Sequence, residues 1–195
     1  VCGNSILLVT DPGIVATGLV AQVLVTLRKV WLTVVVFDQV QADPPESIIL
    51  KAAEMAQDVT GVVGFGGGSS LDVAKLAALL GASNQPLAEA YGIGNAKGPR
   101  LPLILVPTTA GTGSEVTPIS IVTTGESEKM GVVSPLILPD LAVLDPELTL
   151  GLPAHVTAAT GIDAMVHAIE AYSSINPNNN PISRALAVEA LRLMS

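Results

Sequence analysis

Short apolar runs alternate with segments of helical periodicity through the first two-thirds of the chain. The runs are rich in β-branched residues and end in turn-forming residues. Between them, apolar residues recur at four-residue spacing, as at Val15, Leu19, Val23 and Leu27. We therefore predict strands at residues 6–9, 34–37, 61–65 and 103–106, and helices at residues 14–29, 47–58 and 71–81.

The strands alternate with helices and are apolar on both faces. This order predicts a parallel sheet covered by helices, and right-handed crossovers make it a doubly wound, Rossmann-like α/β domain. We expect residues 82–100 to be loop-rich. Further strands are expected at residues 118–123, 132–133 and 142–144.

The last part of the chain differs, because residues 151–195 contain helical periodicity and no strand-like run. We place a domain boundary near Gly151. Residues 1–150 are expected to form the α/β domain, and residues 151–195 the beginning of an all-helical domain.

A glycine-rich turn joins the third predicted strand to the third helix. Gly66, Gly67 and Gly68 allow a ligand to approach the backbone closely. The helix that follows directs free N–H groups and its positive dipole end into the same space, which favours a pyrophosphate. Gly64 and Gly66 match the start of a G-x-G-x-x-G motif, but Ser69 replaces its third glycine. A purely structural turn would also use glycine, so both interpretations stay open.

Two acidic residues lie near this turn. Asp72 falls in the first helical turn, where a carboxylate stabilises the helix dipole or reaches a ribose hydroxyl. Asp38 ends the second strand, and ligands of such sheets bind at the carboxyl ends of strands. It is either a solvated loop residue or a ribose ligand. As a ribose ligand it would repel a 2′-phosphate and favour NAD over NADP.

A polar segment, residues 107–117, follows the strand at residues 103–106 and is dense in hydroxyl and small side chains. A capping box would explain a Ser or Thr followed by Glu. The segment is longer than a cap requires, so we favour a second wall of a ligand site in which threonine hydroxyls bind a polar group.

Composition narrows the classes of function. The 195 residues are 49% hydrophobic, enough for a full core, and carry a formal net charge of −8. This charge argues against nucleic acid or an anionic membrane as partner, so a phosphate would have to be bound by local amides. The single cysteine, Cys2, excludes an intrachain disulfide. With no membrane-length apolar run and no leader visible, we expect a cytoplasmic protein.

Asp163 and His167 are four residues apart in a segment, residues 157–172, that reads as one helix. They therefore share a helix face and supply half of a divalent metal site. Without a third ligand, a metal-free Asp–His pair is the simpler interpretation. His155 and Glu170 are the nearest further candidates, and neither position is compelling.

Four motifs resemble those of the iron-dependent (group III) alcohol dehydrogenases, in the same order and at compatible spacing. The likeness spans essentially the whole chain, and the second and fourth motifs are the most specific. The form of the second is closer to alcohol dehydrogenases proper than to glycerol dehydrogenase or dehydroquinate synthase. The motifs are Gly66-Gly67-Gly68-Ser69 with Asp72 and Lys75, residues 107–117, Leu144-Asp145-Pro146, and residues 159–172.

The resemblance implies that NAD(P) lies in a cleft between the α/β domain and an all-helical domain. It assigns the pyrophosphate to the glycine turn, ribose discrimination to Asp38, and Fe²⁺ or Zn²⁺ to Asp163 and His167. The cofactor contacts expected on this basis are Asp38, Gly66, Gly67, Gly68, Ser69, Asp72, Thr108, Thr109, Thr117, Lys129 and Leu148.

The family has opening strands and two later histidine ligands that this sequence lacks, so we expect a truncated chain. The implied activity is metal-assisted hydride transfer between a short-chain alcohol or aldehyde and NAD, in a homo-oligomer. The alternatives are a non-catalytic nucleotide-binding chain, and an oligomer-forming fragment whose apolar last helix is buried in another chain.

Overall fold

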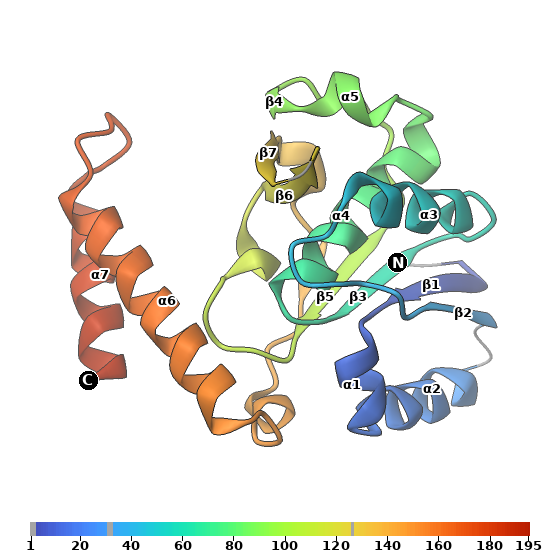
Figure 1. Cartoon of the computed structure of the whole chain (residues 1–195), viewed down its shortest axis with the longest axis horizontal. Helices are drawn as coiled ribbons and strands as arrows, with labels where there is room; N and C mark the ends of the chain where they lie inside the picture. The colour runs from blue at the N-terminus through green and yellow to red at the C-terminus, as the bar shows by residue number, and fades with distance from the viewer. Residues whose placement is uncertain (1–2, 31–32, 126) are drawn as a thin grey trace.

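Five parallel strands form the main sheet of the computed structural model, which describes residues 3–30, 33–125 and 127–195 (Figure 1). Cys2 lies outside the described residues. The strand order is β2-β1-β3-β5-β8, and every neighbouring pair is parallel. The predicted Rossmann-like fold is confirmed. The strands are β1 (Ser5–Val9), β2 (Thr33–Phe37), β3 (Val62–Gly66), β5 (Leu103–Pro107) and β8 (Leu141–Ala142).

Helices cover both faces of this sheet (Figure 1). Successive side chains of β1 point to opposite faces of the sheet, as in any pleated strand. Ile6 and Leu8 pack in one apolar cluster with Ile14 and Val20, whereas Leu7 and Val9 belong to the larger cluster on the other face. The helices are α1 (Pro12–Ala16) and α2 (Leu19–Lys29) on the first face, with α3 (Glu46–Ala56) and α4 (Gly68–Ser83) on the second.

The sheet has a topological switch point between β1 and β3. The chain leaves β1 toward β2 on one side and leaves β3 toward β5 on the other. In open α/β sheets this divergence produces a crevice at the carboxyl ends of the strands, where ligands bind. Asp11 comes two residues after β1 and Gly67 directly follows β3, so both stand at this crevice.

Residues 14–29 do not form the single helix that we predicted. The chain breaks between α1 and α2 at Gly18, whose φ is +83°. The Thr17 hydroxyl donates a 2.7 Å hydrogen bond to the Ile14 carbonyl and closes the first helix. The four-residue spacing misled the prediction at its first position, because Val15 is exposed and α1 packs on the sheet through Ile14 instead.

Residues 82–100 contain two short elements, α5 (Leu87–Ala90) and β4 (Gly92–Ile93), where a loop was predicted. β4 joins β7 (Glu128–Val133) and β6 (Ile119–Thr124) in a second, three-stranded sheet. Such short elements are stabilised by their tertiary neighbours and carry little sequence periodicity of their own. The remaining short helices are η1 (Ser114–Val116), η2 (Pro135–Ile137) and η3 (Pro146–Thr149).

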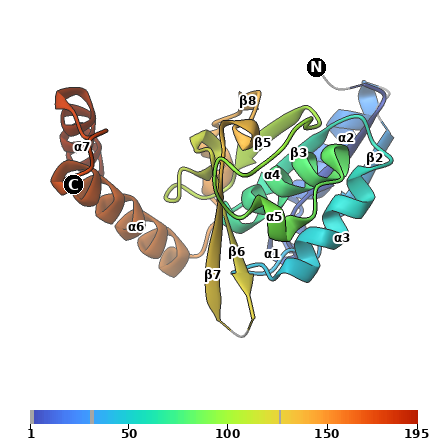
Figure 2. The same ribbon diagram turned by 90° about the horizontal axis from the view of Figure 1, so that it is seen from above.

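The last two helices, α6 (Ala154–Ser173) and α7 (Pro181–Met194), form an antiparallel pair that extends away from the sheet (Figures 1 and 2). Their buried residues are Ala168 on α6 and Ala187 on α7. No described helix combines the length and apolar character that crossing a membrane requires.

Candidate functional site

The glycine turn after β3 exposes unpaired backbone amides at the switch point. Gly66 has φ of +154°, and α4 begins at Gly68 without a side-chain cap. Within the described residues, no acceptor pairs with the amides of Gly67, Gly68 or Ser69. These amides and the positive end of α4 therefore point into the crevice with their hydrogen-bonding capacity unused.

The glycines of this turn are required for different reasons. A Cβ at Gly66 would lie 2.7 Å from the Ser70 hydroxyl oxygen, and one at Gly68 would lie 2.9 Å from Cγ2 of Thr112. A Cβ at Gly67 meets nothing closer than Cγ2 of Thr109, at 3.5 Å. Close packing thus requires glycine at residues 66 and 68. At Gly67 no protein atom requires glycine, and the free space beside it is available to a ligand.

Asp11 is a site residue that the sequence did not single out. Its Oδ1 accepts a 3.0 Å bond from the Ile14 amide as the N-cap of α1, and its Oδ2 accepts one of 3.1 Å from the Ser70 hydroxyl. The carboxylate therefore ties β1 to the start of α4. The signal was present, because Asp before Pro at the start of a helical segment is a typical N-cap pair.

Three neighbouring cavities line the carboxyl edge of the sheet. One of about 420 Å³ contains Gly67, Gly68, Ser69 and Thr109. A second, about 410 Å³, shares Gly67 and Thr109 with it and adds Thr108 and Leu148. These shared residues join the two cavities into one groove. Seven of the predicted cofactor contacts line the groove or the cavity next to it, namely Asp38, Gly67, Gly68, Ser69, Thr108, Thr109 and Leu148.

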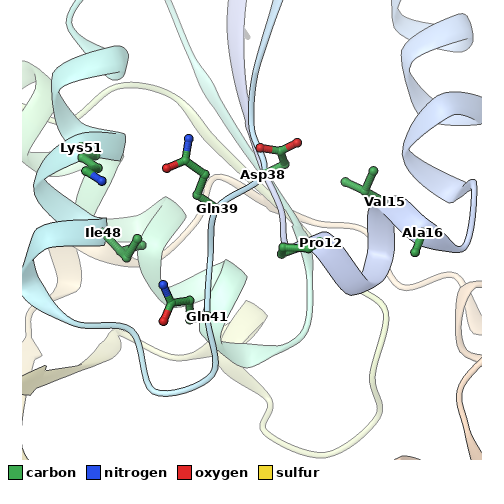
Figure 3. A pocket seen from close by; sticks show the side chains of 8 residues that line it. All are labelled: Pro12, Val15, Ala16, Asp38, Gln39, Gln41, Ile48 and Lys51. Carbon is green, nitrogen blue, oxygen red and sulfur yellow. The ribbon is translucent and has the colours of Figure 1, made fainter.

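The third cavity, about 570 Å³, continues the groove toward β2 and includes Asp38 (Figure 3). It shares Pro12 and Gln41 with the cavity at the glycine turn. Asp38 is exposed at the end of β2, with no ion-pair partner among the described residues. Its carboxylate is therefore available to a ligand that extends from the glycine turn.

The first turns of α6 form the opposite wall of the groove. Val156 and Thr160 line the cavity at the glycine turn. The polar segment that follows β5 contacts the same helix, because a Cβ at Gly111 would lie 2.5 Å from the carbonyl oxygen of Thr160. Helix α6 is thus packed directly against the turn and the threonine-rich segment, and its next turn begins the Asp163–His167 stretch.

Thr108 is fully buried and its hydroxyl has no hydrogen-bond partner within the described structure. Its amide donates to the Gly66 carbonyl at 2.9 Å, which fixes the residue beside the glycine turn. A buried hydroxyl without a partner costs free energy, and it lines a cavity large enough for a ligand. Protein atoms cover the oxygen itself, as they cover the unpartnered hydroxyls of Thr10 and Thr124 in the described structure.

Four predicted cofactor contacts lie outside the three cavities: Gly66, Asp72, Thr117 and Lys129. Asp72 is engaged by protein groups. Its Oδ1 accepts from the Ser114 hydroxyl at 2.5 Å, and its Oδ2 accepts from the Ile121 amide at 3.0 Å. The carboxylate holds α4 against the segment that leads into β6 and has little capacity left for a ribose.

Lys75 completes this buried network. Its Nζ donates to the Ile119 carbonyl at 2.6 Å, to the Ser114 hydroxyl at 2.8 Å and to the Thr117 hydroxyl at 3.3 Å. Burial lowers the pKa of the Lys75 amine, and Asp72 partly opposes this shift. The Thr117 hydroxyl is therefore a packing contact of Lys75 in this structure.

Lys129 lies on β7, where its Nζ pairs with Asp43 at 2.5 Å and donates to the Thr123 hydroxyl at 3.0 Å. Asp43 has φ of +54° and immediately precedes Pro44, whose carbonyl accepts from the Thr123 amide. The structure thus places Lys129 in the contact between the β6–β7 hairpin and the loop before α3.

Asp163 and His167 share one face of α6, as their spacing predicts, with Oδ1 3.7 Å from Nε2. Both side chains are about half exposed. A carboxylate and an imidazole suit a borderline divalent ion such as Fe²⁺ or Zn²⁺. Among the described residues, no third His, Cys, Asp or Glu gathers with this pair. The pair therefore fits part of a metal donor set, and the predicted metal role stays a prediction.

Two family models match this chain. Residues 1–146 match the family described as iron-containing alcohol dehydrogenase, and residues 157–195 match the C-terminal domain of the same family. Long-chain-alcohol dehydrogenase 1 of Geobacillus thermodenitrificans is 46% identical over 97% of this chain. That match covers 49% of the Geobacillus protein, so the chain spans about half the length of this relative.

Solved structures give the same result. An iron-containing alcohol dehydrogenase of Thermotoga maritima superposes with a TM-score of 0.89 at 36% identity, over 99% of this chain and 54% of that protein. Sulfoacetaldehyde reductase of Bifidobacterium kashiwanohense, solved in complex with NAD⁺, superposes with a TM-score of 0.87 at 34% identity, over 99% and 51%. The chain belongs to the iron-containing alcohol dehydrogenase family.

Proposed function

We propose that this chain binds NAD in the groove at the carboxyl edge of the sheet. The observation that carries the proposal is the set of unpaired amides at Gly67, Gly68 and Ser69, which face a cavity of about 420 Å³. Amides and a helix dipole bind a diphosphate without a cationic side chain, which suits a chain of net charge −8.

The two neighbouring cavities suit the other parts of a dinucleotide. The cavity that contains Leu148 is mostly apolar, with Ile14, Leu152 and Val156 around it, and suits one of the flat ring systems. On the side of β2, Asp38 would accept hydrogen bonds from ribose hydroxyls, which favours NAD over NADP.

The activity that we propose for the whole protein is reversible hydride transfer between an alcohol and NAD. Asp163 and His167 would contribute to holding a divalent metal, which acts as a Lewis acid on the substrate oxygen. The groove would orient the dinucleotide, and α6, packed on it at Thr160, would keep the metal ligands at a fixed distance from the cofactor.

The substrate class that we propose is a small alcohol or aldehyde. The relatives above are named for a long-chain alcohol and for sulfoacetaldehyde. Membership in the family therefore does not determine which group the substrate has beside its alcohol or aldehyde carbon. The expectations of a cytoplasmic location and a homo-oligomer stay predictions.

Replacement of Gly67 by Ala tests NAD binding directly. Gly67 has φ of −76°, which Ala adopts without strain, and the new Cβ makes only ordinary contacts. The methyl group would occupy the space beside the free amides and should weaken NAD binding at least tenfold in calorimetric titration, without loss of thermal stability.

Gly131→Ala is the matched control. Gly131 lies on β7, away from the groove, and its Cβ would also come no closer than 3.5 Å to a neighbour, Cδ1 of Ile121. This variant should bind NAD like the parent. Equal affinities of the parent and the Gly67→Ala variant would refute the proposed binding site.

A second function is supported by the incomplete ligand set on α6. Because no third ligand joins Asp163 and His167 among the described residues, the 195-residue chain by itself would bind the dinucleotide without catalysing hydride transfer. An assay of alcohol oxidation with added Fe²⁺ or Zn²⁺, run beside the NAD titration, separates the two functions. Turnover by the 195-residue chain would refute the second function, and binding without turnover would support it.

A further inference from the structure

Asp11 is the only charged side chain among the described residues that line the two cavities at the glycine turn, and it belongs to both. A carboxylate repels the diphosphate proposed for this site, so attraction of the ligand does not explain its presence. Both of its oxygens are occupied by protein donors. Oδ1 accepts from the Ile14 amide at 3.0 Å, and Oδ2 accepts from the Ser70 hydroxyl at 3.1 Å. Asp11 therefore acts on the protein around the site rather than on the ligand.

The Asp11–Ser70 hydrogen bond is the one side-chain hydrogen bond that the described structure contains for residues 66–70. Ser70 is 1% exposed, so without Asp11 its hydroxyl would be buried and unpaired. A hydrogen bond to a charged carboxylate is also stronger than one between neutral groups. Because Oδ1 is held by α1, whose Ile14 is buried in the core, the carboxylate fixes the start of α4 to a rigid part of the fold.

This bond matters because the glycine turn is flexible by composition. Three consecutive glycines have more backbone freedom than other residues, and α4 begins without a side-chain cap. At one end of the turn, the Thr108 amide donates to the Gly66 carbonyl at 2.9 Å. At the other end, Asp11 holds Ser70. The unpaired amides of residues 67–69 lie between these two fixed points.

Gly66 fits closely against the same bond. A Cβ at this position would lie 2.7 Å from the Ser70 hydroxyl oxygen and 3.1 Å from Oδ2 of Asp11. Both atoms of the bond are therefore in contact with the backbone of the turn itself. The three residues form one unit, in which the position of the hydrogen bond determines the position of the turn.

We propose that Asp11 is a positioning residue for the anion site. Through Ser70, it holds the amides of residues 67–69 in the arrangement that binds a diphosphate before the ligand arrives, which lowers the entropy cost of binding. This inference rests on the proposed binding of a dinucleotide in the groove. It predicts that loss of the bond weakens ligands with a diphosphate and leaves the binding of a nucleoside unchanged.

Replacement of Ser70 by Ala removes the bond and leaves Asp11 as the N-cap of α1. We expect the affinity for NAD and for ADP to fall about tenfold in calorimetric titration, because one hydrogen bond to a charged group no longer holds the amides. Adenosine has no phosphate, so its affinity, measured by competition with NAD, should be unchanged. An equal loss for adenosine would mean that the whole groove is disturbed, and would overturn the positioning role.

Ser120→Ala is the matched control. Ser120 is fully buried, and its hydroxyl donates a single 3.1 Å bond to the Asp72 carbonyl. It lines none of the three cavities of the groove. Both variants lose one buried hydrogen bond of the same length, so they should lower the melting temperature by similar amounts. Only Ser70→Ala should weaken NAD, and an equal loss of NAD affinity in Ser120→Ala would assign the effect to stability.

Two substitutions of Asp11 separate its position from its charge. In Asp11→Asn, the amide oxygen still accepts from Ile14, and the amide nitrogen donates to the Ser70 oxygen. This variant should bind NAD as tightly as the parent or more tightly, because the charge that it removes has the sign of the ligand. Asp11→Ala loses the bond, and its NAD affinity should fall about tenfold. A loss in Asp11→Asn as large as in Asp11→Ala would show that the charge is required, and would overturn the proposal.

The positioning role and the proposed function can fail separately. If the parent binds NAD, and Ser70→Ala binds NAD and ADP as the parent does, the positioning role is refuted and the proposed function stands. If the parent does not bind NAD, the proposed function fails and the positioning role fails with it.

Discussion

Helices α4 and α6 form opposite walls of one groove but differ in how completely the chain surrounds them. Ten of the 16 residues of α4 are buried, including Lys75, whose charge is satisfied by internal partners. Helix α6 buries one of its 20 residues, and Ile162 and Ile169 on it are more than half exposed. The glycine-turn side of the groove is therefore held by its own core, whereas the described residues leave most of the helix with Asp163 and His167 uncovered.

Truncating one leucine on α4 should show this difference most strongly. Leu76 is fully buried in the larger core, so Leu76→Ala should lower the free energy of unfolding by about 2–5 kcal/mol. Ile162→Ala on α6 should change it by no more than about 0.5 kcal/mol. Urea denaturation measures both. Similar losses in the two variants would mean that α6 is as well packed as α4.

Adding one methyl group to a glycine gives the converse comparison. A Cβ at Gly64 would lie 2.7 Å from Cδ2 of Leu105 and 2.8 Å from Cβ of Ala74, so Gly64→Ala should destabilise the protein by about 1–3 kcal/mol. Gly161 on α6 has open space around its Cβ position. Gly161→Ala should stabilise the helix by up to about 1 kcal/mol. A thermal melt of each variant gives the sign, and a stabilising Gly64→Ala would contradict tight packing under the glycine turn.

An ion pair beside the sheet should stabilise the fold more than an ion pair on the last helices. Asp140 accepts from both terminal nitrogens of Arg100, at 2.8 and 2.9 Å, and from the Leu103 amide at 2.8 Å. Because the Asp140 side chain is 41% exposed and solvent screens the pair, Asp140→Asn should lower the free energy of unfolding at pH 7 by about 1 kcal/mol. The exposed Glu189–Arg192 pair on α7 is the control, and Glu189→Gln should leave the unfolding midpoint unchanged within error.

The pH dependence of the Asp140 effect identifies its cause. The hydrogen bonds from Arg100 hold the pKa of the Asp140 carboxyl below 3.8. A carboxyl whose pKa is lower in the folded state stabilises the fold. The stabilisation is complete at pH values above the pKa of the unfolded state, 3.8, and is lost as the pH falls through the pKa of the folded state. The gap between the parent and the Asp140→Asn variant should thus persist down to pH 4 and close below it. A gap independent of pH would assign the effect to packing.

The smallest effect is expected from metal addition. With two exposed ligands, Zn²⁺ at about 1 mM should stabilise the 195-residue chain by less than about 1 kcal/mol. His167→Ala should remove even this shift in a thermal melt, whereas His155→Ala should retain it. A large stabilisation of the parent would mean that further ligands complete the site.

The sequence predicted the main sheet well because its signals are local. Each apolar run ends in residues that stop a strand, and the glycine turn sits at a strand–helix junction in any doubly wound sheet. The break at Gly18 was missed because Val15 continues the spacing of the α2 positions, although it is exposed and Ile14 is the α1 residue that packs on the sheet. The sequence did mark the break, with a glycine inside the helical pattern. Sequence does not tell a glycine that a helix tolerates from one that ends it, because the two differ in the backbone angle φ.

The site was less accessible from sequence because its partners are distant in the chain. Asp72 was expected either to stabilise the start of its helix or to reach a ribose, and its oxygens meet Ser114 and Ile121, which lie 42 and 49 residues away. No spacing rule connects these positions. The wall formed by Val156 and Thr160 was missed for the same reason, since only the docking of α6 brings it to the glycine turn.

The contact between Gly111 and Thr160 limits how closely α6 and the threonine-rich segment can approach each other. The threonine-rich segment and the helix with Asp163 meet there at the clearance of a hydrogen atom, because even a methyl group at residue 111 would overlap the helix backbone. Because the two backbones are already this close, α6 has no room to move further toward the threonine-rich segment at this point. In the proposed enzyme, this contact would limit how near the helix with Asp163 and His167 comes to the threonine-rich wall of the groove.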